Sequence, residues 1–251
     1  MLYIGLFLLV VIAFLLYMWK VAHENNVLHH QLSLHGEQEQ VRLFFISDVH
    51  LRKINKKMIA QLEGHFDAVI IGGDFADSRT PIERIHENLT LLKSIAPIYF
   101  VWGNNDREIG EERLKDILQA YQVQIIVNDA VLLPVKNRFW LSAIEDTTVK
   151  EYSFEKAFEK VGEQDLVVFI AHNPGVFAKV RAKFRADLMM GGHLHGGQIR
   201  FGPYGVHPNG SYRQRDGVMT LGSNGYGTTL VPFRLGAKPQ CHIIDIDISS
   251  K

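Results

Sequence analysis

The sequence of 251 residues has a single cysteine, Cys241, and this scarcity excludes an intrachain disulfide and a cysteine-rich zinc site. An excess of charge of either sign is also missing, because Lys and Arg together number 27 and so do Asp and Glu. The chain therefore has no overall positive field to concentrate nucleic acid, and we expect no nucleic-acid partner. Hydrophobic residues make up 47% of the chain, which predicts one soluble domain with a substantial core and a short additional segment.

Charge is absent altogether from Leu2–Trp19, an uninterrupted apolar and aromatic stretch. At about 1.5 Å per residue it would form a helix roughly 27 Å long, close to the thickness of the hydrocarbon core of a bilayer. A cleaved signal peptide is the main alternative, but no Lys or Arg precedes the apolar run and no small-x-small cleavage pattern follows it. We predict a transmembrane anchor over residues 1–19 and a single-pass protein of the cell membrane.

Positive charge near the apolar run lies only on its C-terminal side, beginning at Lys20. The positive-inside rule therefore favours a cytoplasmic catalytic domain. Residues 20–40 are mostly polar and rich in histidine, which predicts a juxtamembrane linker, either a helix or a loose tether. The remaining residues, 41–251, are expected to form the soluble domain.

From residue 41 onward short apolar runs alternate with helical patterns, which is typical of βαβ units and a parallel sheet. Three short runs in the middle of the domain, at 123–127, 130–135 and 139–144, predict an antiparallel meander. After Gly196 the abundance of Gly, Pro, Asn and Tyr predicts long ordered loops. The expected fold is α/β, with two sheets flanked by helices. Further strands are expected at 41–47, 67–71, 98–102, 166–171, 188–190, 218–221 and 242–248, and helices at 54–66, 81–95, 111–121, 154–161 and 174–184.

Side chains able to bind metal directly follow five of these apolar strands. Carboxyl ends of strands in an open α/β sheet meet at one crevice, so these distant segments can converge. Carboxylate, imidazole and amide ligands without thiolate suit Mn²⁺, Fe or Zn²⁺ in a catalytic site. Any one of these residues is more often a turn former, a helix cap or a solvated side chain, but five segments in this order predict a metal site. The candidate ligands are Asp48, His50, Asp74, Asn104, His172, His193 and His195.

The order of these motifs resembles that of the calcineurin-like metallophosphoesterases, whose series is D-x-H, G-D, G-N-H-D/E, a lone H and G-H-x-H. Gly-Gly-Gln after His195 and Gly-Ser-Asn-Gly at 222–225 are similar to a branch of small, often membrane-associated bacterial phosphoesterases. That branch includes enzymes similar to UDP-2,3-diacylglucosamine hydrolases. The matching residues here are Asp48 and His50, Gly73 and Asp74, Gly103 and Asn104, His172, and His193 and His195.

The resemblance implies a four-layer αββα sandwich and two divalent metal ions, of Mn, Fe or Zn, bridged by Asp74. Such a pair would activate a bridging hydroxide for attack on the phosphorus of a phosphoester or pyrophosphate bond. A membrane anchor suits a lipid-linked substrate, and a nucleotide or another phosphorylated small molecule is the alternative. The implied ligands are Asp48, His50, Asp74 and His195 for one ion, and Asp74, Asn104, His172 and His193 for the other.

One position departs from the family pattern, because Asn105 stands where the third motif usually has histidine. An amide can donate a hydrogen bond to a phosphoryl oxygen but cannot deliver a proton near neutral pH. Three interpretations stay open. The enzyme prefers leaving groups that need little protonation, or Asp106 or His207 supplies the proton, or catalysis is weak. The last case would make the chain a metal-binding membrane protein with a regulatory or scaffolding role.

Overall fold

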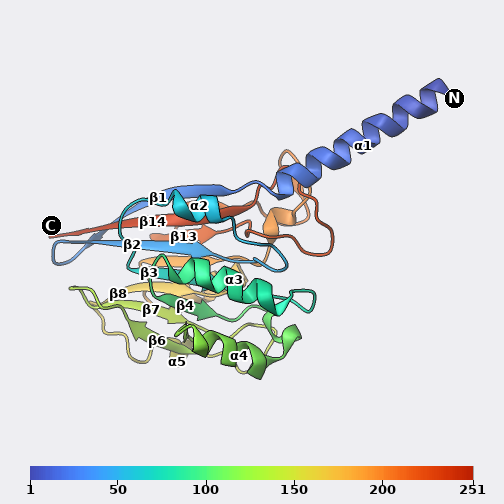
Figure 1. Cartoon of the computed structure of the whole chain (residues 1–251). Helices are drawn as coiled ribbons and strands as arrows, with labels where there is room; N and C mark the ends of the chain where they lie inside the picture. The colour runs from blue at the N-terminus through green and yellow to red at the C-terminus, as the bar shows by residue number, and fades with distance from the viewer. Residues whose placement is uncertain (251) are drawn as a thin grey trace.

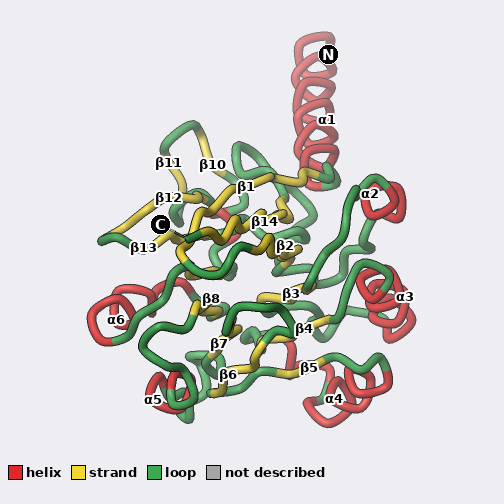
Figure 2. The backbone as a smooth tube through the Cα atoms, turned by 90° about the vertical axis from the view of Figure 1, so that its left-hand side faces the viewer, coloured by secondary structure: helices red, strands yellow, loops and turns green. Residues whose placement is uncertain are grey.

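A computed structural model describes residues 1–250 of the chain and confirms the α/β architecture with two sheets between layers of helices (Figures 1 and 2). Three hydrophobic clusters fill the interfaces between four layers. The largest cluster joins the first sheet to its helices, the second lies between the sheets, and the third joins the second sheet to its helices. The layers are therefore helix, sheet, sheet and helix.

The first sheet has six strands among the described residues, in the order β1-β14-β2-β3-β4-β5. β2, β3, β4 and β5 run parallel, so their carboxyl ends share one edge, whereas β14 runs antiparallel to β2. The strands are β1 (Asn26–His35), β2 (Glu39–Ile46), β3 (Ala68–Gly72), β4 (Ile98–Val101), β5 (Gln124–Ile125) and β14 (Gln240–Ser249).

The second sheet also has six strands in residues 1–250, in the order β12-β13-β9-β8-β7-β6. Its four central strands are parallel, and the two edge strands are antiparallel to their neighbours. A separate hairpin pairs β10 (Arg200–Phe201) with β11 (Tyr204–Gly205). The sheet strands are β6 (Asp129–Leu132), β7 (Phe139–Ala143), β8 (Leu166–Ile170), β9 (Leu188–Gly191), β12 (Ser211–Arg215) and β13 (Val218–Gly222).

Helices cover the outer face of each sheet, as Figure 2 shows. In α3 the buried residues Ile85, Leu89 and Leu92 recur at helical spacing and face the first sheet. The helices over the first sheet are α2 (Lys56–Ala60), α3 (Ile82–Lys93) and α4 (Glu111–Ala120), and those over the second are α5 (Phe154–Phe158) and α6 (Phe177–Lys183). Short 3-10 turns are η1 (Asp106–Ile109), η2 (Pro174–Val176) and η3 (His195–Gly197).

The predicted antiparallel meander is wrong. β5 pairs parallel with β4 in the first sheet, and only β6 and β7 pair antiparallel, in the second sheet. An apolar run predicts a strand, but its length and composition do not predict which sheet the strand joins. The helix predicted at 54–66 is also shorter than expected, because α2 ends at Ala60. Gly64 follows with φ of 83°, a left-handed conformation that an α-helix cannot pass through.

Residues 26–35 are neither a helix nor a loose tether, and that prediction is wrong for this segment. They form β1, which pairs in parallel with β14 along its whole length. Leu32 is buried between the two sheets and Leu34 packs against the same cluster, while His29 and Gln31 are exposed. This alternation is the period of a strand, hidden in the sequence by the polar side chains on the exposed face.

Helix α1 (Leu2–Ala22) extends away from the domain (Figure 1). It is long and apolar enough to cross a membrane by length and composition, a test that a signal sequence also passes. Only its last turns are buried, at Met18, Val21 and Ala22. The end of α1 is therefore packed into the domain, and the direction in which the helix leaves is set by contacts.

We predict that β1 contributes measurably to stability. Leu32→Ala should lower the free energy of unfolding by about 2 kcal/mol, because a nearly buried leucine leaves a cavity between the sheets. Thermal or denaturant unfolding of the full chain in detergent measures this change. The control is His29→Ala on the exposed face of the same strand, which should change stability by less than about 0.5 kcal/mol. Equal stability of the two variants would contradict a packed β1.

Candidate metal centre

The candidate ligands lie on five loops that converge at the carboxyl ends of parallel strands, as the sequence predicted. Backbone hydrogen bonds lock two of these loops together, because the N–H of Asp48 donates to Gly73 O at 2.9 Å and that of His50 to Asp74 O at 3.1 Å. Five candidate ligands have left-handed backbone conformations, which non-glycine residues adopt only where surrounding contacts enforce them. They are Asp48 (φ 52°), His50 (φ 50°), Asp74 (φ 52°), His193 (φ 70°) and His195 (φ 48°).

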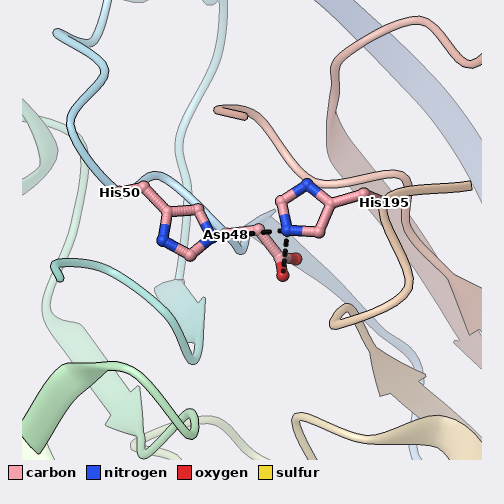
Figure 3. A group of neighbouring side chains, drawn as sticks. All are labelled: Asp48, His50 and His195. Carbon is pink, nitrogen blue, oxygen red and sulfur yellow. Dashed lines mark hydrogen bonds and ion pairs between the residues drawn. The ribbon is translucent and has the colours of Figure 1, made fainter. Parts of the chain in front are cut away.

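Asp48, His50 and His195 form a first buried cluster of ligand atoms (Figure 3). Nε2 of His195 lies 3.3 Å from Oδ1 of Asp48 and 3.3 Å from Nε2 of His50. Atoms that bind one ion at about 2.1 Å lie roughly 3 to 3.5 Å apart, so this spacing suits ligands of a single cation.

Asp74, His172 and His193 form a second cluster. Nε2 of His172 lies 3.3 Å from Oδ2 of Asp74 and 3.3 Å from Nδ1 of His193. The same Oδ2 of Asp74 lies 3.7 Å from Nε2 of His50, which belongs to the first cluster. Asp74 therefore lies between the two clusters, in the position that a carboxylate shared by two ions would occupy.

Asn104 gives an independent indication that the site is built for a cation. Its Oδ1 atom is buried and has no hydrogen-bond partner among residues 1–250. A buried acceptor without a partner costs free energy unless something else satisfies it, and a divalent ion is a suitable partner for an amide oxygen. The donor set and this unpaired oxygen together fit two divalent ions.

The site carries opposite charges that compensate one another in the absence of metal. Burial raises the pKa of Asp48, but His195, His172 and His50 outweigh that effect and hold its pKa well below the usual range. Burial lowers the pKa of His172, but Asp74 outweighs it and raises the pKa to about 10. Binding of a cation would therefore displace a proton from His172, and the carboxylates would keep their compensation.

Further residues orient the ligands, and sequence reasoning missed most of them. Nδ1 of His172 donates to Gly72 O at 2.9 Å, which directs Nε2 into the site. Nδ1 of His50 lies 3.2 Å from Oδ2 of Asp77, an electrostatic contact on that ring, although Nδ1 makes no hydrogen bond within residues 1–250. Asp77 belongs to no motif of the resemblance. Its position three residues after Asp74 was the only signal in the sequence.

Arg234 is completely buried behind the site and pairs with no carboxylate in residues 1–250. Its guanidinium donates to the carbonyls of Asn224, Gly227 and Ala237, and its Nη2 lies 3.2 Å from Nδ1 of His195. Burial lowers the pKa of Arg234 to about 9, although Asp48 partly opposes this. Arg234 therefore joins the loops at 224–237 to the candidate ligand His195. No sequence motif predicts this role.

The three residues predicted to take part in catalysis differ in placement. Asn105 lies against Asp74, donating its backbone N–H to Oδ1 and its Nδ2 to Oδ2, each at 2.8 Å. His207 is exposed in the loop after β11, and its backbone N lies close to Gly197. Asn105 is thus part of the cluster, whereas His207 reaches its neighbourhood only through the backbone.

Asp106 is fully buried, and both of its carboxylate oxygens accept backbone N–H groups. Oδ2 accepts from Asp74 at 2.8 Å and Gly103 at 2.7 Å, and Oδ1 accepts from Ala76 at 3.0 Å. Burial and the charge of Asp74 raise the pKa of Asp106 to about 7. We interpret Asp106 as a positioning residue that ties two ligand loops together.

A cavity of about 310 Å³ adjoins the loop that carries His193. Gly192 and Leu194 line its end near the metal centre, and α6, β12 and β13 form its walls. Its volume is at the lower end of the range for small-molecule sites. Three arginines line it, Arg181, Arg213 and Arg215, together with apolar groups such as Phe177 and Pro208.

Comparison with known proteins agrees with this geometry. A family model described as calcineurin-like phosphoesterase matches residues 41–197. The chain is 35% identical over 234 residues to the uncharacterized protein YpbG of Bacillus subtilis (strain 168), covering 91% of this chain and 90% of that protein. It is 25% identical over 224 residues to phosphodiesterase YaeI of Escherichia coli (strain K12), covering 82% of each.

A third relative is the uncharacterized metallophosphoesterase YkoQ of Bacillus subtilis (strain 168), which is 24% identical over an alignment of 228 residues that covers 81% of this chain and 82% of that one. The chain therefore belongs to the calcineurin-like phosphoesterase family. It is a metal-dependent phosphoric ester hydrolase with two candidate clusters of metal ligands.

We predict that Asp77→Asn lowers metal affinity by roughly 10- to 100-fold, because an amide orients the His50 ring less strongly than a carboxylate does. Titration of the apoprotein with Mn²⁺ or Zn²⁺ by calorimetry measures this. Arg79→Ala is the matched control, since Arg79 contacts the same carboxylate at 2.6 Å without touching a candidate ligand. Unchanged affinity in Asp77→Asn would show that His50 needs no such partner.

Proposed function

We propose that the protein hydrolyses a phosphoester or pyrophosphate bond of a substrate presented at a membrane, with a leaving group that needs little protonation. The position of Asp74 between two histidine clusters is the observation that carries the hydrolytic part. It supports a centre with two ions of Mn, Fe or Zn. Such ions, when bound, would neutralise phosphoryl oxygens and lower the pKa of a water molecule.

The chain's own residues would place the reacting groups. Asp48, His50 and His195 would hold one ion, Asn104, His172 and His193 the other, and Asp74 both. The side-chain amide of Asn105 donates to Asp74 at 2.8 Å, and a donor at this position would favour negative charge that develops on a phosphoryl oxygen in the transition state. Asp106 and Asp77 would keep the ligands in place.

Asn105 supports the restriction on the leaving group. Neither candidate acid belongs to the two ligand clusters, because Asp106 is enclosed by backbone N–H groups and His207 is exposed in the loop after β11. A phosphate or aryl oxygen departs without a proton far more readily than an alkoxide does. The substrate should therefore carry a pyrophosphate bond or a comparably good leaving group.

Two features support a membrane-borne substrate. The apolar helix α1 is packed by its last turns into the domain that carries the metal centre, in keeping with a single-pass cell-membrane protein. The arginine-lined cavity beside His193 suits an anionic group attached to an apolar one. A cytoplasmic location of the domain, and a branch resembling UDP-2,3-diacylglucosamine hydrolases, remain predictions of the sequence.

The second candidate function is a regulatory or scaffolding protein that binds metal and turns over slowly. The replacement at Asn105 is the one observation that favours it. Turnover of an activated substrate separates the two functions. A scaffold would bind metal but would not hydrolyse the substrate.

We predict metal-dependent hydrolysis of bis(p-nitrophenyl) phosphate by the purified full chain, lost on chelation and restored by Mn²⁺ or Zn²⁺. Asp74→Asn should abolish it, since both clusters lose their shared carboxylate. Asp116→Asn, an exposed change on α4, is the control and should retain full activity. Metal binding without any turnover in the unmodified chain would favour the scaffold.

We predict that Asn105→His raises the rate on alkyl phosphoesters by roughly 10-fold or more and leaves aryl or pyrophosphate substrates nearly unchanged. The reason is that imidazole can donate a proton to a poor leaving group and an amide cannot. Steady-state rates on the two substrate classes test this. Asn105→Gln controls for a change of size and should give no gain. Equal rates of the unmodified enzyme on alkyl phosphoesters and on aryl or pyrophosphate substrates would contradict the proposed restriction on the leaving group.

A further inference from the structure

Five large apolar side chains are exposed on two neighbouring loops. One is the β10–β11 hairpin with the residue after it, and the other is the loop 228–233. No Asp, Glu, Lys or Arg occurs in residues 201–210 or 226–233. We call these five residues the apolar rim: Phe201 (67% exposed), Tyr204 (79%), Val206 (80%), Leu230 (86%) and Val231 (44%).

Hydrogen bonds make the two loops one structural unit. The Gln198 side chain donates to the carbonyls of Thr229 and Val231 at 3.1 and 3.0 Å, and accepts from the N–H of Thr229 at 2.9 Å. The N–H of Arg200 donates to Leu235 O at 2.8 Å. The apolar residues are therefore held outward by fixed loops, and their exposure is a feature of the fold.

The rim lies beside the base of α1. The N–H of Arg234 donates to Met18 O at 3.1 Å, which joins the second loop directly to the last turns of the helix. Figure 1 shows the orange and red loops next to the point where α1 leaves the domain, at the end opposite to the C-terminus. A helix that crosses a bilayer would bring these loops to the bilayer surface.

The same loops are fastened to the metal centre. The guanidinium of Arg200 donates to Gly196 O at 2.9 Å and to the carbonyls of the hairpin turn, Gly202 and Pro203, at 3.1 and 2.9 Å. Arg234 contacts both the carbonyl and the ring of His195. The rim, the base of α1 and a candidate metal ligand thus share two buried arginines.

We propose that the apolar rim inserts into the interfacial layer of the membrane that α1 spans, and that the metal centre thereby faces the lipid headgroups. Exposed apolar groups gathered on uncharged loops mark a surface that water does not cover in the working state. Tyrosine beside aliphatic residues is the composition of a membrane interface. The inference rests on the proposed function for its consequence, which is that the scissile phosphorus belongs to a lipid headgroup.

The test uses the full chain in vesicles of phosphatidylcholine and phosphatidylglycerol. Leu230→Cys and Tyr204→Cys each receive an environment-sensitive nitrobenzoxadiazole label, and spin-labelled lipids act as quenchers. The native Cys241 is fully buried, and burial raises its pKa to about 12, so it stays unlabelled. The matched control is Leu132→Cys, an apolar position 47% exposed at the end of β6 that lies away from the metal centre.

The proposal expects blue-shifted emission and at least 3-fold stronger lipid quenching at positions 204 and 230 than at 132. Equal, weak quenching at all three positions would overturn it. Protection of 204 and 230 that rises with protein concentration and ignores the spin-labelled lipids would overturn it too, and would identify a protein partner instead.

A kinetic measurement separates this proposal from the proposed function. Leu230→Ser combined with Tyr204→Ser should lower kcat/KM at least 5-fold for a phospholipid-borne pyrophosphate in vesicles and leave bis(p-nitrophenyl) phosphate hydrolysis unchanged. Equal losses on both substrates would overturn the membrane role of the rim. Lipid quenching in a protein without any phosphoesterase activity would support insertion of the apolar rim into the membrane and would contradict the proposed function.

Discussion

The structure depends on two buried carboxylates, Asp48 and Asp74, which lie on neighbouring loops of the first sheet that backbone hydrogen bonds join to one another. Burying such charges is costly unless opposite charges or metal ions compensate them. Here histidines converge on both carboxylates, and an amide oxygen from Asn104 is left without a partner. The site is consequently satisfied only in part by the protein itself. An affinity for divalent ions would follow from this unsatisfied arrangement more than from any single candidate ligand.

The strained backbone of the ligand loops is accompanied by glycines packed closely against the carboxylates. Left-handed conformations at Asp48 and Asp74 turn the chain sharply at the strand ends, and close backbone approach makes room for the carboxylates. A Cβ at Gly192 would lie 2.2 Å from Oδ2 of Asp48, and one at Gly103 would lie 2.3 Å from Oδ1 of Asp74. Only glycine is compatible with either position. These two glycines are therefore needed for the carboxylates of Asp48 and Asp74 to lie where they do.

The convergence of the candidate ligands was predictable from sequence because each follows an apolar strand, and parallel strands bring their carboxyl ends to one edge whatever lies between them. Other features lacked such a local signal. β1 is polar on its exposed face, so its alternation resembled a tether, and β5 could not be assigned to a sheet from its own residues. Arg234 makes no ion pair in residues 1–250, and its role arises from carbonyls that come together only in the folded chain.

The replacement at Asn105 and the direction in which α1 leaves the domain point to the same kind of substrate. If no acid stands near the leaving group, as we propose, the bond that breaks must release a stable anion, and a pyrophosphate bond would meet this requirement. With α1 packed at the edge where the ligand loops converge, a substrate that diffuses within the bilayer would reach the centre without leaving the surface. A lipid-linked pyrophosphate satisfies both constraints. Under the proposed arrangement a soluble alkyl phosphomonoester would satisfy neither, because it would need a proton donor and would gain nothing from a site that faced the membrane.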